Sequence, residues 1–217
     1  MMKRNIILMG PPGAGKGTLA TALKEQLHLV HISTGDMFRE AIKAGTPLGK
    51  EAKSYLDSGN LVPDSVTIGL VKERLSQDDC KDGFLLDGFP RTLVQAEALN
   101  ELSKEIDRPI EVVINLTCDE NALIERISGR RVCPKCGTPY HTSFKKPQKE
   151  NVCDVCGTEL YQRPDDNENA LKVRLQHYAN DTKPLLDYYD KQGLLASFDA
   201  NNSIKHIFDE VINFLKK

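Results

Sequence analysis

A glycine-rich stretch near the start of the chain has the residue types and spacing of a phosphate-binding loop. It runs from Gly10 to Thr18, follows the apolar run 6–9 and leads into a helical pattern. The backbone N–H groups of such a turn and the positive end of the helix dipole point at one small volume, which suits a polyphosphate. Lys16 adds a mobile ammonium group for the phosphates. A glycine-rich turn that binds nothing is the alternative, and the flanking strand and helix disfavour it.

One position departs from the strict form of this loop. Gly17 stands where a Ser or Thr usually offers its hydroxyl to Mg²⁺, and Thr18 comes one residue later. We therefore expect the metal to be held by phosphates, water and a carboxylate from elsewhere. A candidate carboxylate is Asp87, which ends the apolar run of 83–88. In open parallel α/β sheets ligands lie beyond the carboxyl ends of the strands, so Asp87 is predicted to face the same crevice as the loop.

Four cysteines form a second group with chemical meaning. Two C-x₂-C pairs, Cys133 with Cys136 and Cys153 with Cys156, are separated by residues 137–152, and a glycine follows each pair. This spacing is typical of a zinc ribbon, in which four thiolates surround one Zn²⁺ tetrahedrally. Because such a site has no open coordination position, its predicted role is structural. Redox pairs or thiols without a ligand are the alternative.

Arginines bracket the cysteine pairs on both sides. Arg126, Arg130 and Arg131 precede them, and Arg163 and Arg174 follow. Planar guanidinium groups at both roots of an insertion could close over a phosphate and screen the charge that develops on a transferred phosphoryl group. Solvated surface arginines are the alternative for any one of them.

Composition limits the remaining possibilities. The 217 residues include 29 Lys plus Arg against 31 Asp plus Glu, for a net charge of −2, so there is no global attraction to nucleic acid or anionic membranes. The apolar run 6–9 is too short for a signal peptide, no run reaches transmembrane length, and a cytoplasmic protein is expected. In a reducing compartment the six cysteines should not form disulfides.

The elements that must position these residues alternate along the chain. Strands are predicted over 6–9, 30–32, 83–88, 110–116 and 194–198. Helices are predicted over 14–27, from 37 to a break at 45–49, over 50–56, from a cap at Asp64 past 75, over 92–102 and 122–128, over 169–189 with a stop or kink near Pro184, and after a cap at Ser203. This alternation predicts an α/β fold, a P-loop parallel sheet wound with helices on both faces.

Residues 87–92, Asp-Gly-Phe-Pro-Arg-Thr, make the interpretation specific. Together with the loop 10–18 and the segment 33–39, they closely resemble the adenylate kinase family, and the resemblance extends over essentially the whole chain. The four-cysteine segment resembles the zinc-bearing lid of the long-lid bacterial form. The resemblance implies a core domain of residues 1–32, 63–128 and 167–217, a helical insertion for the nucleoside monophosphate at 33–62, and a zinc-binding lid at 129–166.

The resemblance also implies an activity and its participants. It implies reversible Mg²⁺-dependent in-line transfer, ATP + AMP = 2 ADP, which maintains the balance of adenine nucleotides. The implied cofactors are Mg²⁺ with ATP and structural Zn²⁺ in the lid, and the only implied partners are ATP, AMP and ADP. A monomer is expected, without nucleic acid or membrane.

Residue roles follow from the same resemblance. Asp87 would orient hydrated Mg²⁺, and Asp165 and Asp166 would be carboxylates of the lid hinge. The implied ATP-binding residues are Gly13, Ala14, Gly15, Lys16, Gly17, Thr18, Arg130, Pro139, Tyr140 and Asn202. The implied AMP-binding residues are Thr34, Arg39, Asn60, Leu61, Val62, Gly88, Phe89, Pro90, Arg91, Gln95, Arg163 and Arg174. The implied catalytic residues are Lys16, Asp87, Arg91, Arg126, Arg130, Arg163 and Arg174.

Two rival functions remain open at the level of the sequence. The first is another nucleoside-monophosphate kinase, or one that uses GTP as donor, although Thr34 and Gln95 in their family contexts favour AMP. The second is a zinc-ribbon module that binds nucleic acid, because Lys145, Lys146 and Lys149 lie between the cysteine pairs. No aromatic row for base stacking accompanies these lysines, and a solvated surface explains them.

Overall fold

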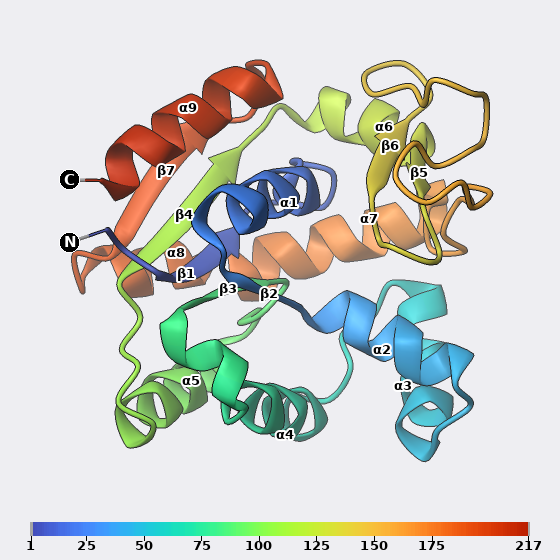
Figure 1. Ribbon diagram of the computed structural model, residues 1–217. Coiled ribbons are helices and arrows are strands. Elements are labelled where there is room, and N and C mark those ends of the chain that lie inside the picture. Colours follow the sequence, from blue (N-terminus) through green and yellow to red (C-terminus); the bar gives the residue numbers. More distant parts are fainter. Residues whose placement is uncertain (1, 217) are drawn as a thin grey trace.

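A five-stranded parallel sheet lies at the centre of the computed structural model, which describes residues 2–216 (Figure 1). Its strand order is β2-β3-β1-β4-β7, and every neighbouring pair is parallel. The first strand in the chain is central, so the phosphate loop that follows it opens at the middle of the sheet edge. The strands are β1 (Asn5–Met9), β2 (Val30–Ser33), β3 (Phe84–Asp87), β4 (Val112–Thr117) and β7 (Leu195–Asp199).

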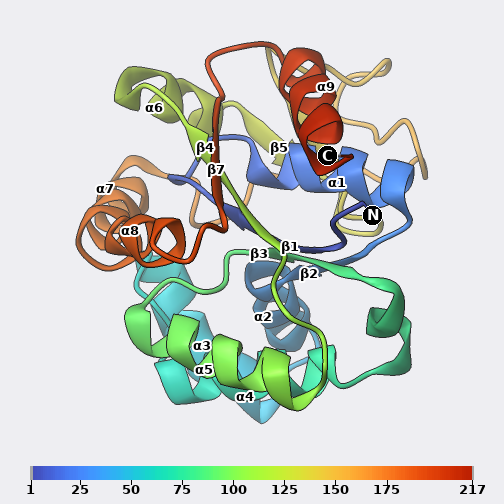
Figure 2. The ribbon, with the colours of Figure 1, turned by 90° about the vertical axis from the view of Figure 1, so that its left-hand side faces the viewer.

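Helices cover both faces of the sheet, as Figure 2 shows with the sheet between two layers. Successive residues of a strand point to opposite faces, so Ile6 and Leu8 pack on one side while Ile7 and Met9 pack on the other. All four are buried. The first face carries α1 (Lys16–Leu27), α6 (Glu120–Ser128) and α9 (Ile204–Leu215), and the second carries α4 (Asp64–Leu75), α5 (Leu93–Glu105) and α8 (Pro184–Asp190).

Two segments project from this core, and each has a small apolar cluster of its own. The first, which we call the helical insertion, is residues 33–62 and holds α2 (Thr34–Lys43) and α3 (Pro47–Ser58) around Phe38 and Ala52. The second, which we call the cysteine segment, is residues 129–166. Its strands β5 (Arg130–Val132) and β6 (Pro139–His141) form an antiparallel pair beside a cluster of Cys133, Tyr140, Cys153 and Leu160.

The structure corrects two details of the predicted elements. The predicted break at 45–49 ends at Thr46, because Thr46 caps α3 by accepting from the Gly49 N–H and Pro47 suits the first helical position. Asp64 is not the cap of α4, since Pro63 holds that place and the Asp64 carboxylate bonds to side chains of α5 and its cap.

The helix predicted over 169–189 is interrupted near Pro184, as expected. It consists of α7 (Glu168–His177), a π-helical stretch η2 (Tyr178–Thr182) and α8, and the π-helical stretch lies just before Pro184. The short hairpin of β5 and β6 and the 3₁₀ helix η1 (Asp78–Asp82) were not predicted. Within residues 2–216, no helix has both the length and the apolar character that crossing a bilayer requires.

Candidate functional site

The loop between β1 and α1 has the backbone conformation that the glycines predict. Gly10, Gly13 and Gly15 all have positive φ, and a Cβ on Gly10 would lie 2.6 Å from the Leu116 carbonyl oxygen. Gly15 is the N-cap of α1, so no side chain caps this helix, and its first turn holds no acidic residue. The N–H groups at the start of α1 therefore remain available for an anionic ligand.

Lys16 lies within the loop that it is expected to serve. Its Nζ donates to the carbonyl oxygens of Gly10 and Pro11, at 2.7 and 2.9 Å. Burial lowers the pKa of Lys16 to about 8; the carboxylate of Asp87 opposes this change, and Arg91, Arg174 and Arg130 add to it. The ammonium group is therefore held where it lacks solvent and faces other cations, a situation that a bound phosphate would relieve.

Asp87 ends β3 next to the loop, as predicted. Its Oδ2 lies 3.5 Å from Nε2 of His31, and about as far from the position that a Cβ on Gly17 would take. Burial alone would raise the pKa of Asp87, but His31 and then Lys16 outweigh burial and hold it below its usual value. The carboxylate thus stays ionised in a position that faces the phosphate loop.

Arg91 and Thr34 converge on the turn that follows Asp87. The Arg91 Nε and the Thr34 hydroxyl both donate to the Gly88 carbonyl oxygen, at 2.8 and 3.0 Å. Thr182 of η2 donates to the Arg91 carbonyl oxygen. Between Gly88 and Arg91 the Phe89–Pro90 peptide bond is cis, and the Phe89 side chain is buried in the core. Arg91 is thereby fixed by its backbone and its side chain.

Gln95 is held at both ends of its amide group. Its Oε1 accepts from the Arg91 N–H at 2.8 Å, and its Nε2 donates to Asp64 at 2.7 Å. The Thr92 hydroxyl also donates to Asp64, and Gln95 itself is 2% exposed. This network joins α4 to α5 and fixes Gln95 beside Arg91, which agrees with their prediction as neighbours in one site.

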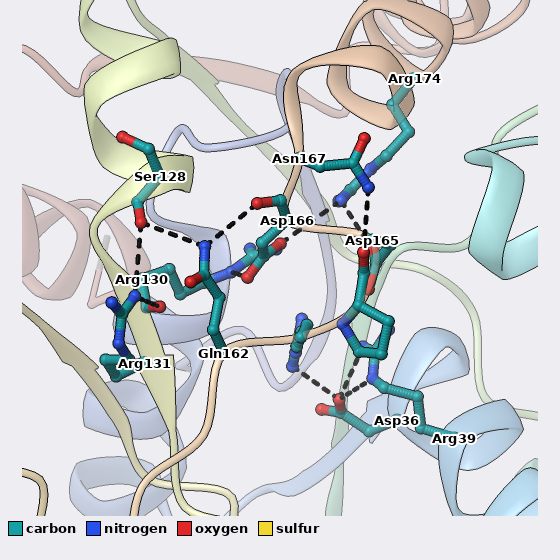
Figure 3. A network of polar contacts seen from close by, with 12 residues as sticks. Asp36, Arg39, Ser128, Arg130, Arg131, Gln162, Asp165, Asp166, Asn167 and Arg174 are labelled. Carbon is teal, nitrogen blue, oxygen red and sulfur yellow. Dashed lines mark hydrogen bonds and ion pairs between the residues drawn. The ribbon is translucent and has the colours of Figure 1, made fainter.

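Asp36 joins the helical insertion to the cysteine segment (Figure 3). Its Oδ1 accepts from Nη2 of Arg39 at 2.8 Å and from Nη2 of Arg163 at 2.9 Å. Burial opposes ionisation of Asp36, but the two guanidinium groups lower its pKa to about 2. Two arginines from segments far apart in the sequence therefore meet at one carboxylate.

Two ion pairs lie at the base of the cysteine segment, one within the segment and one that ties it to the core (Figure 3). Arg130 forms a bidentate ion pair with Asp166, whose side chain is fully buried. Arg174 of α7 donates to Asp165 at 3.0 Å. Burial and the nearby Arg130 lower the pKa of Arg174 to about 10, while Asp165 partly offsets them. These carboxylates match the predicted positions at the base of the segment.

The cations of this region outnumber the carboxylates that neutralise them. Burial is the first cause that lowers the pKa of Arg91 and of Arg163, and neighbouring arginines contribute to both. The buried Nε of Arg163 has no hydrogen-bond partner among the described residues. A cluster of partly desolvated donors with excess positive charge is an anion site, and its planar guanidinium groups suit phosphate oxygens. The convergent cations are Lys16, Arg39, Arg91, Arg130, Arg163 and Arg174.

The remaining predicted residues lie at the edges of this cluster. Arg126 donates to the Ala200 carbonyl oxygen at 2.8 Å, so it joins α6 to the loop before α9. In that loop Asn202 is exposed and donates to the Asp199 carbonyl oxygen. Leu61 and Val62 follow Asn60 where the helical insertion rejoins the core, and Val62 is buried in the cluster of that insertion.

Tyr140, which is predicted to lie near ATP, packs within the cysteine segment. Its ring is buried in the cluster of the cysteine segment, and its hydroxyl lies 3.5 Å from Cys153 Sγ and accepts from the Asp154 N–H. Pro139 pairs with Val132 in the two-stranded sheet beside it. The contacts of Tyr140 therefore link it to the cysteines rather than to the convergent cations.

The four cysteines of the predicted zinc ribbon meet at one point. Their Sγ atoms all lie within 4.8 Å of one another, and three of the separations are 3.4, 3.5 and 3.6 Å. A tetrahedral ion with bonds of about 2.3 Å to sulfur requires sulfur atoms about 3.8 Å apart. The cluster therefore fits a metal ion without rearrangement of its backbone.

Sequence reasoning missed three partners of the site residues. Asp36 was seen only as part of the segment 33–39, Asp64 was assigned to a helix cap, and His31 was assigned to a strand without a role. Asp64 and His31 lie far along the chain from the residues that they contact, and Asp36 contacts the distant Arg163 as well as Arg39 in its own helix. The available signals were the spacing of Asp36 and Arg39 and the position of Asp36 after a predicted strand, where ligands bind in parallel sheets.

Comparison with known proteins agrees with this geometry. Residues 8–194 match the family model described as adenylate kinase. The chain is 54% identical to the adenylate kinases of Staphylococcus aureus strain Mu50 and of Geobacillus sp. strain WCH70, in each case over 97% of this chain and 98% of the relative. It is also 54% identical to the adenylate kinase of Bacillus licheniformis, over 97% of both chains.

Proposed function

The chain belongs to the adenylate kinase family, whose reaction is the reversible transfer ATP + AMP = 2 ADP, and we propose that its convergent cations bind and align the two nucleotides. The observation that carries this proposal is that Lys16 and five arginines from different segments face one volume next to the phosphate loop. Such an arrangement suits a reaction in which two anions must be held in line.

The donor, ATP, would lie on the phosphate loop. The N–H groups of residues 16–18 at the start of α1 and the ammonium group of Lys16 would hold its phosphates, with Gly13, Ala14 and Gly15 in the loop and Arg130 beside them. Arg126 and Asn202 would line the site of the purine base, which is supported by the contact of Arg126 with the loop before α9. Pro139 and Tyr140 would approach this site from the cysteine segment, while the Tyr140 hydroxyl stays engaged by Cys153 and Asp154.

The acceptor, AMP, would lie between the helical insertion and α5. Arg39 and Arg91 would hold its phosphate, and the region of Thr34, Gly88 and Gln95 would receive its base. This assignment is supported by the shared hydrogen bonds of Thr34 and Arg91 to Gly88 and of Arg91 to Gln95. On arrival, the phosphate would replace Asp36 as the partner of Arg39.

Transfer between these sites needs no general base, because a monophosphate is already an anion near neutral pH. The arginines that reach toward the middle of the cluster, Arg163 and Arg174, would stabilise the charge that spreads over the transferring group. The segments that carry them would also exclude water, which would otherwise accept the phosphoryl group. The residues therefore act by alignment and electrostatics.

We also propose that Asp87 helps to hold Mg²⁺ with its shell of water. An ionised carboxylate facing the phosphate loop offers the oxygen ligands that Mg²⁺ requires. Because Gly17 has no hydroxyl to offer the ion, the Asp87 carboxylate is the more important. When bound, Mg²⁺ neutralises charge on the β- and γ-phosphates.

The ion in the cysteine cluster is proposed to be Zn²⁺ with a structural role. Four thiolates at tetrahedral spacing leave no position for substrate, and Zn²⁺ suits them. The cysteine segment has only a small apolar cluster, so metal binding would supply much of the free energy that folds it.

Three domains are proposed on the same basis. The core would be residues 1–32, 63–128 and 167–217, the AMP-binding domain 33–62, and the lid 129–166. Support comes from the separate apolar clusters of the two projecting segments. A cytoplasmic monomer is proposed as well. The six free cysteines agree with a reducing compartment, and all of the site residues come from one chain.

The direct test of the function is an assay with purified protein, Mg²⁺, ATP or GTP as donor, and AMP, CMP, UMP or GMP as acceptor. We expect ATP with AMP to give the highest kcat/KM, with ADP as the sole product by chromatography. Preferred transfer to another monophosphate would overturn the AMP site, and absence of transfer from every pair would overturn the assigned reaction.

The role of Arg91 is tested by the substitution Arg91→Ala. Removing a preorganised donor from the acceptor phosphate should lower kcat/KM for AMP by about 10²- to 10³-fold, while the far-ultraviolet circular dichroism spectrum is unchanged. Arg74→Ala is the matched control, because Arg74 pairs with the exposed Asp79, and its kcat/KM should remain within about twofold of wild type. Near-normal kinetics of Arg91→Ala would refute the assignment.

The zinc site is tested by Cys153→Ser. We expect the zinc content of the purified protein to fall from one ion per chain, because three thiolates bind more weakly than four. A loss of about 2 kcal/mol would lower Tm by roughly 4–8 °C. Cys118→Ser, outside the cluster, should keep its zinc. An unchanged zinc stoichiometry in Cys153→Ser would contradict the assignment of zinc to the four cysteines.

A further inference from the structure

His177 lies at the place where the helical insertion rejoins the core. It is the last residue of α7, one turn after Arg174. Its Nδ1 lies 2.8 Å from Oδ2 of Asp181, and its Nε2 lies 3.2 Å from Oδ1 of Asn60. The imidazole ring therefore bridges η2 to the residue that immediately precedes Leu61 and Val62.

The orientation of the Asn60 amide group follows from its other contact. Asn60 Nδ2 lies 2.9 Å from the Ser58 hydroxyl, and that hydroxyl donates its single hydrogen to a carbonyl oxygen, Ser54 at 2.8 Å or Tyr55 at 3.1 Å. The Ser58 oxygen must then accept, so the Asn60 atom that faces it is the NH₂ group. Asn60 consequently presents its oxygen to His177.

Both ring nitrogens of His177 thus face hydrogen-bond acceptors. A neutral imidazole carries one N–H and could satisfy only one of them, whereas an imidazolium carries two. The contacts are complete only when His177 is doubly protonated. Among the described residues, only Asp181 and Asn60 lie within hydrogen-bonding distance of this ring.

Several charged groups on the elements packed against α7 are engaged elsewhere, whereas Lys50 and Glu51 of α3 and Glu120 and Glu125 of α6 form no ion pair among the described residues. On α3, which packs against α7, Lys53 pairs with Asp57. On α7 itself Arg174 pairs with Asp165, and on α6, which also packs against α7, Arg126 bonds to the Ala200 carbonyl oxygen. A change in the charge of His177 would therefore act mainly on Asp181 and Asn60.

The bridge acts at a tight junction of the backbone. A Cβ on Gly59 would lie 2.6 Å from the Ala170 carbonyl oxygen and 3.2 Å from Cγ of Arg174. The backbone at Gly59, just before Asn60, therefore packs directly against α7. Any shift of Asn60 away from His177 would move Leu61 and Val62, which belong to the proposed AMP site. We propose that His177, when doubly protonated, is a positioning residue that holds this side of the AMP site through Asn60.

This inference rests on the proposed AMP site and gives a definite dependence on pH. The bridge is complete while the imidazole is charged and is lost as rising pH removes its proton, so its contribution to AMP binding is present at low pH and absent at high pH. The titration of the AMP phosphate itself also affects KM, but it does so equally in every variant. The informative quantity is therefore the ratio of AMP KM values between a variant and the wild type.

The test compares wild type with His177→Gln in steady-state assays from about pH 5 to about pH 8, the range in which imidazole changes charge. We expect His177→Gln to raise the AMP KM about threefold at the acidic end, a modest effect because the ring is partly exposed, and to match wild type at the basic end. The KM for ATP should be unchanged throughout. The matched control is His206→Gln, which removes another histidine paired with a carboxylate four residues on, in α9.

A spectroscopic measurement tests the charge state directly. The ¹⁵N chemical shifts of the His177 ring, assigned by comparison with His177→Gln, should show two protonated nitrogens at about pH 5, the acidic end of the range in which imidazole changes charge. A neutral ring at that pH, or a His177→Gln to wild-type ratio of AMP KM values that does not change with pH, would overturn the inference. Failure of wild type to transfer phosphate to AMP would instead overturn the proposed function.

Discussion

Like charges crowded in a poorly solvated volume are the constraint on which the rest of this structure depends. Burial is the first cause that lowers the pKa values of Lys16 and Arg174, and the neighbouring Arg91 and Arg130 lower both further. Such a group is stable only where carboxylates or bound anions neutralise it. Asp36, Asp165 and Asp166 provide part of that neutralisation, and the phosphates of the substrates would provide the remainder.

The fold supplies the cations from separate elements, so the site is complete only where those elements meet. The parallel sheet brings the phosphate loop and Asp87 to one edge, and the projecting segments add Arg39 and Arg163 from opposite sides. The Asp36 carboxylate accepts hydrogen bonds from both Arg39 and Arg163. The approach of the two segments therefore depends on the negative charge that lies between these guanidinium groups. A phosphate that takes the place of Asp36 would use the same donors.

The sequence predicted the fold class, the phosphate loop and the cysteine cluster because each depends on a local pattern. Glycine spacing, C-x₂-C pairs and alternating periodicity are properties of neighbouring residues. The partners of Arg163 and Gln95 could not be predicted in this way, since Asp36 and Asp64 each lie more than twenty-five positions away from them. The contacts of Tyr140 could not be predicted for a related reason, because its burial against the cysteines depends on the tertiary packing of the segment.

The most direct measurement of the central claim is the uptake of protons on binding of ATP at pH 8, from calorimetric enthalpies in buffers of different ionisation enthalpy. A Lys16 with a pKa of about 8 in the free protein is half charged at this pH, and phosphate binding should restore its full charge, with uptake of about half a proton. Lys16→Met should abolish that uptake. Equal proton uptake by both proteins would contradict the claim that nucleotide phosphates relieve a crowded cluster of cations.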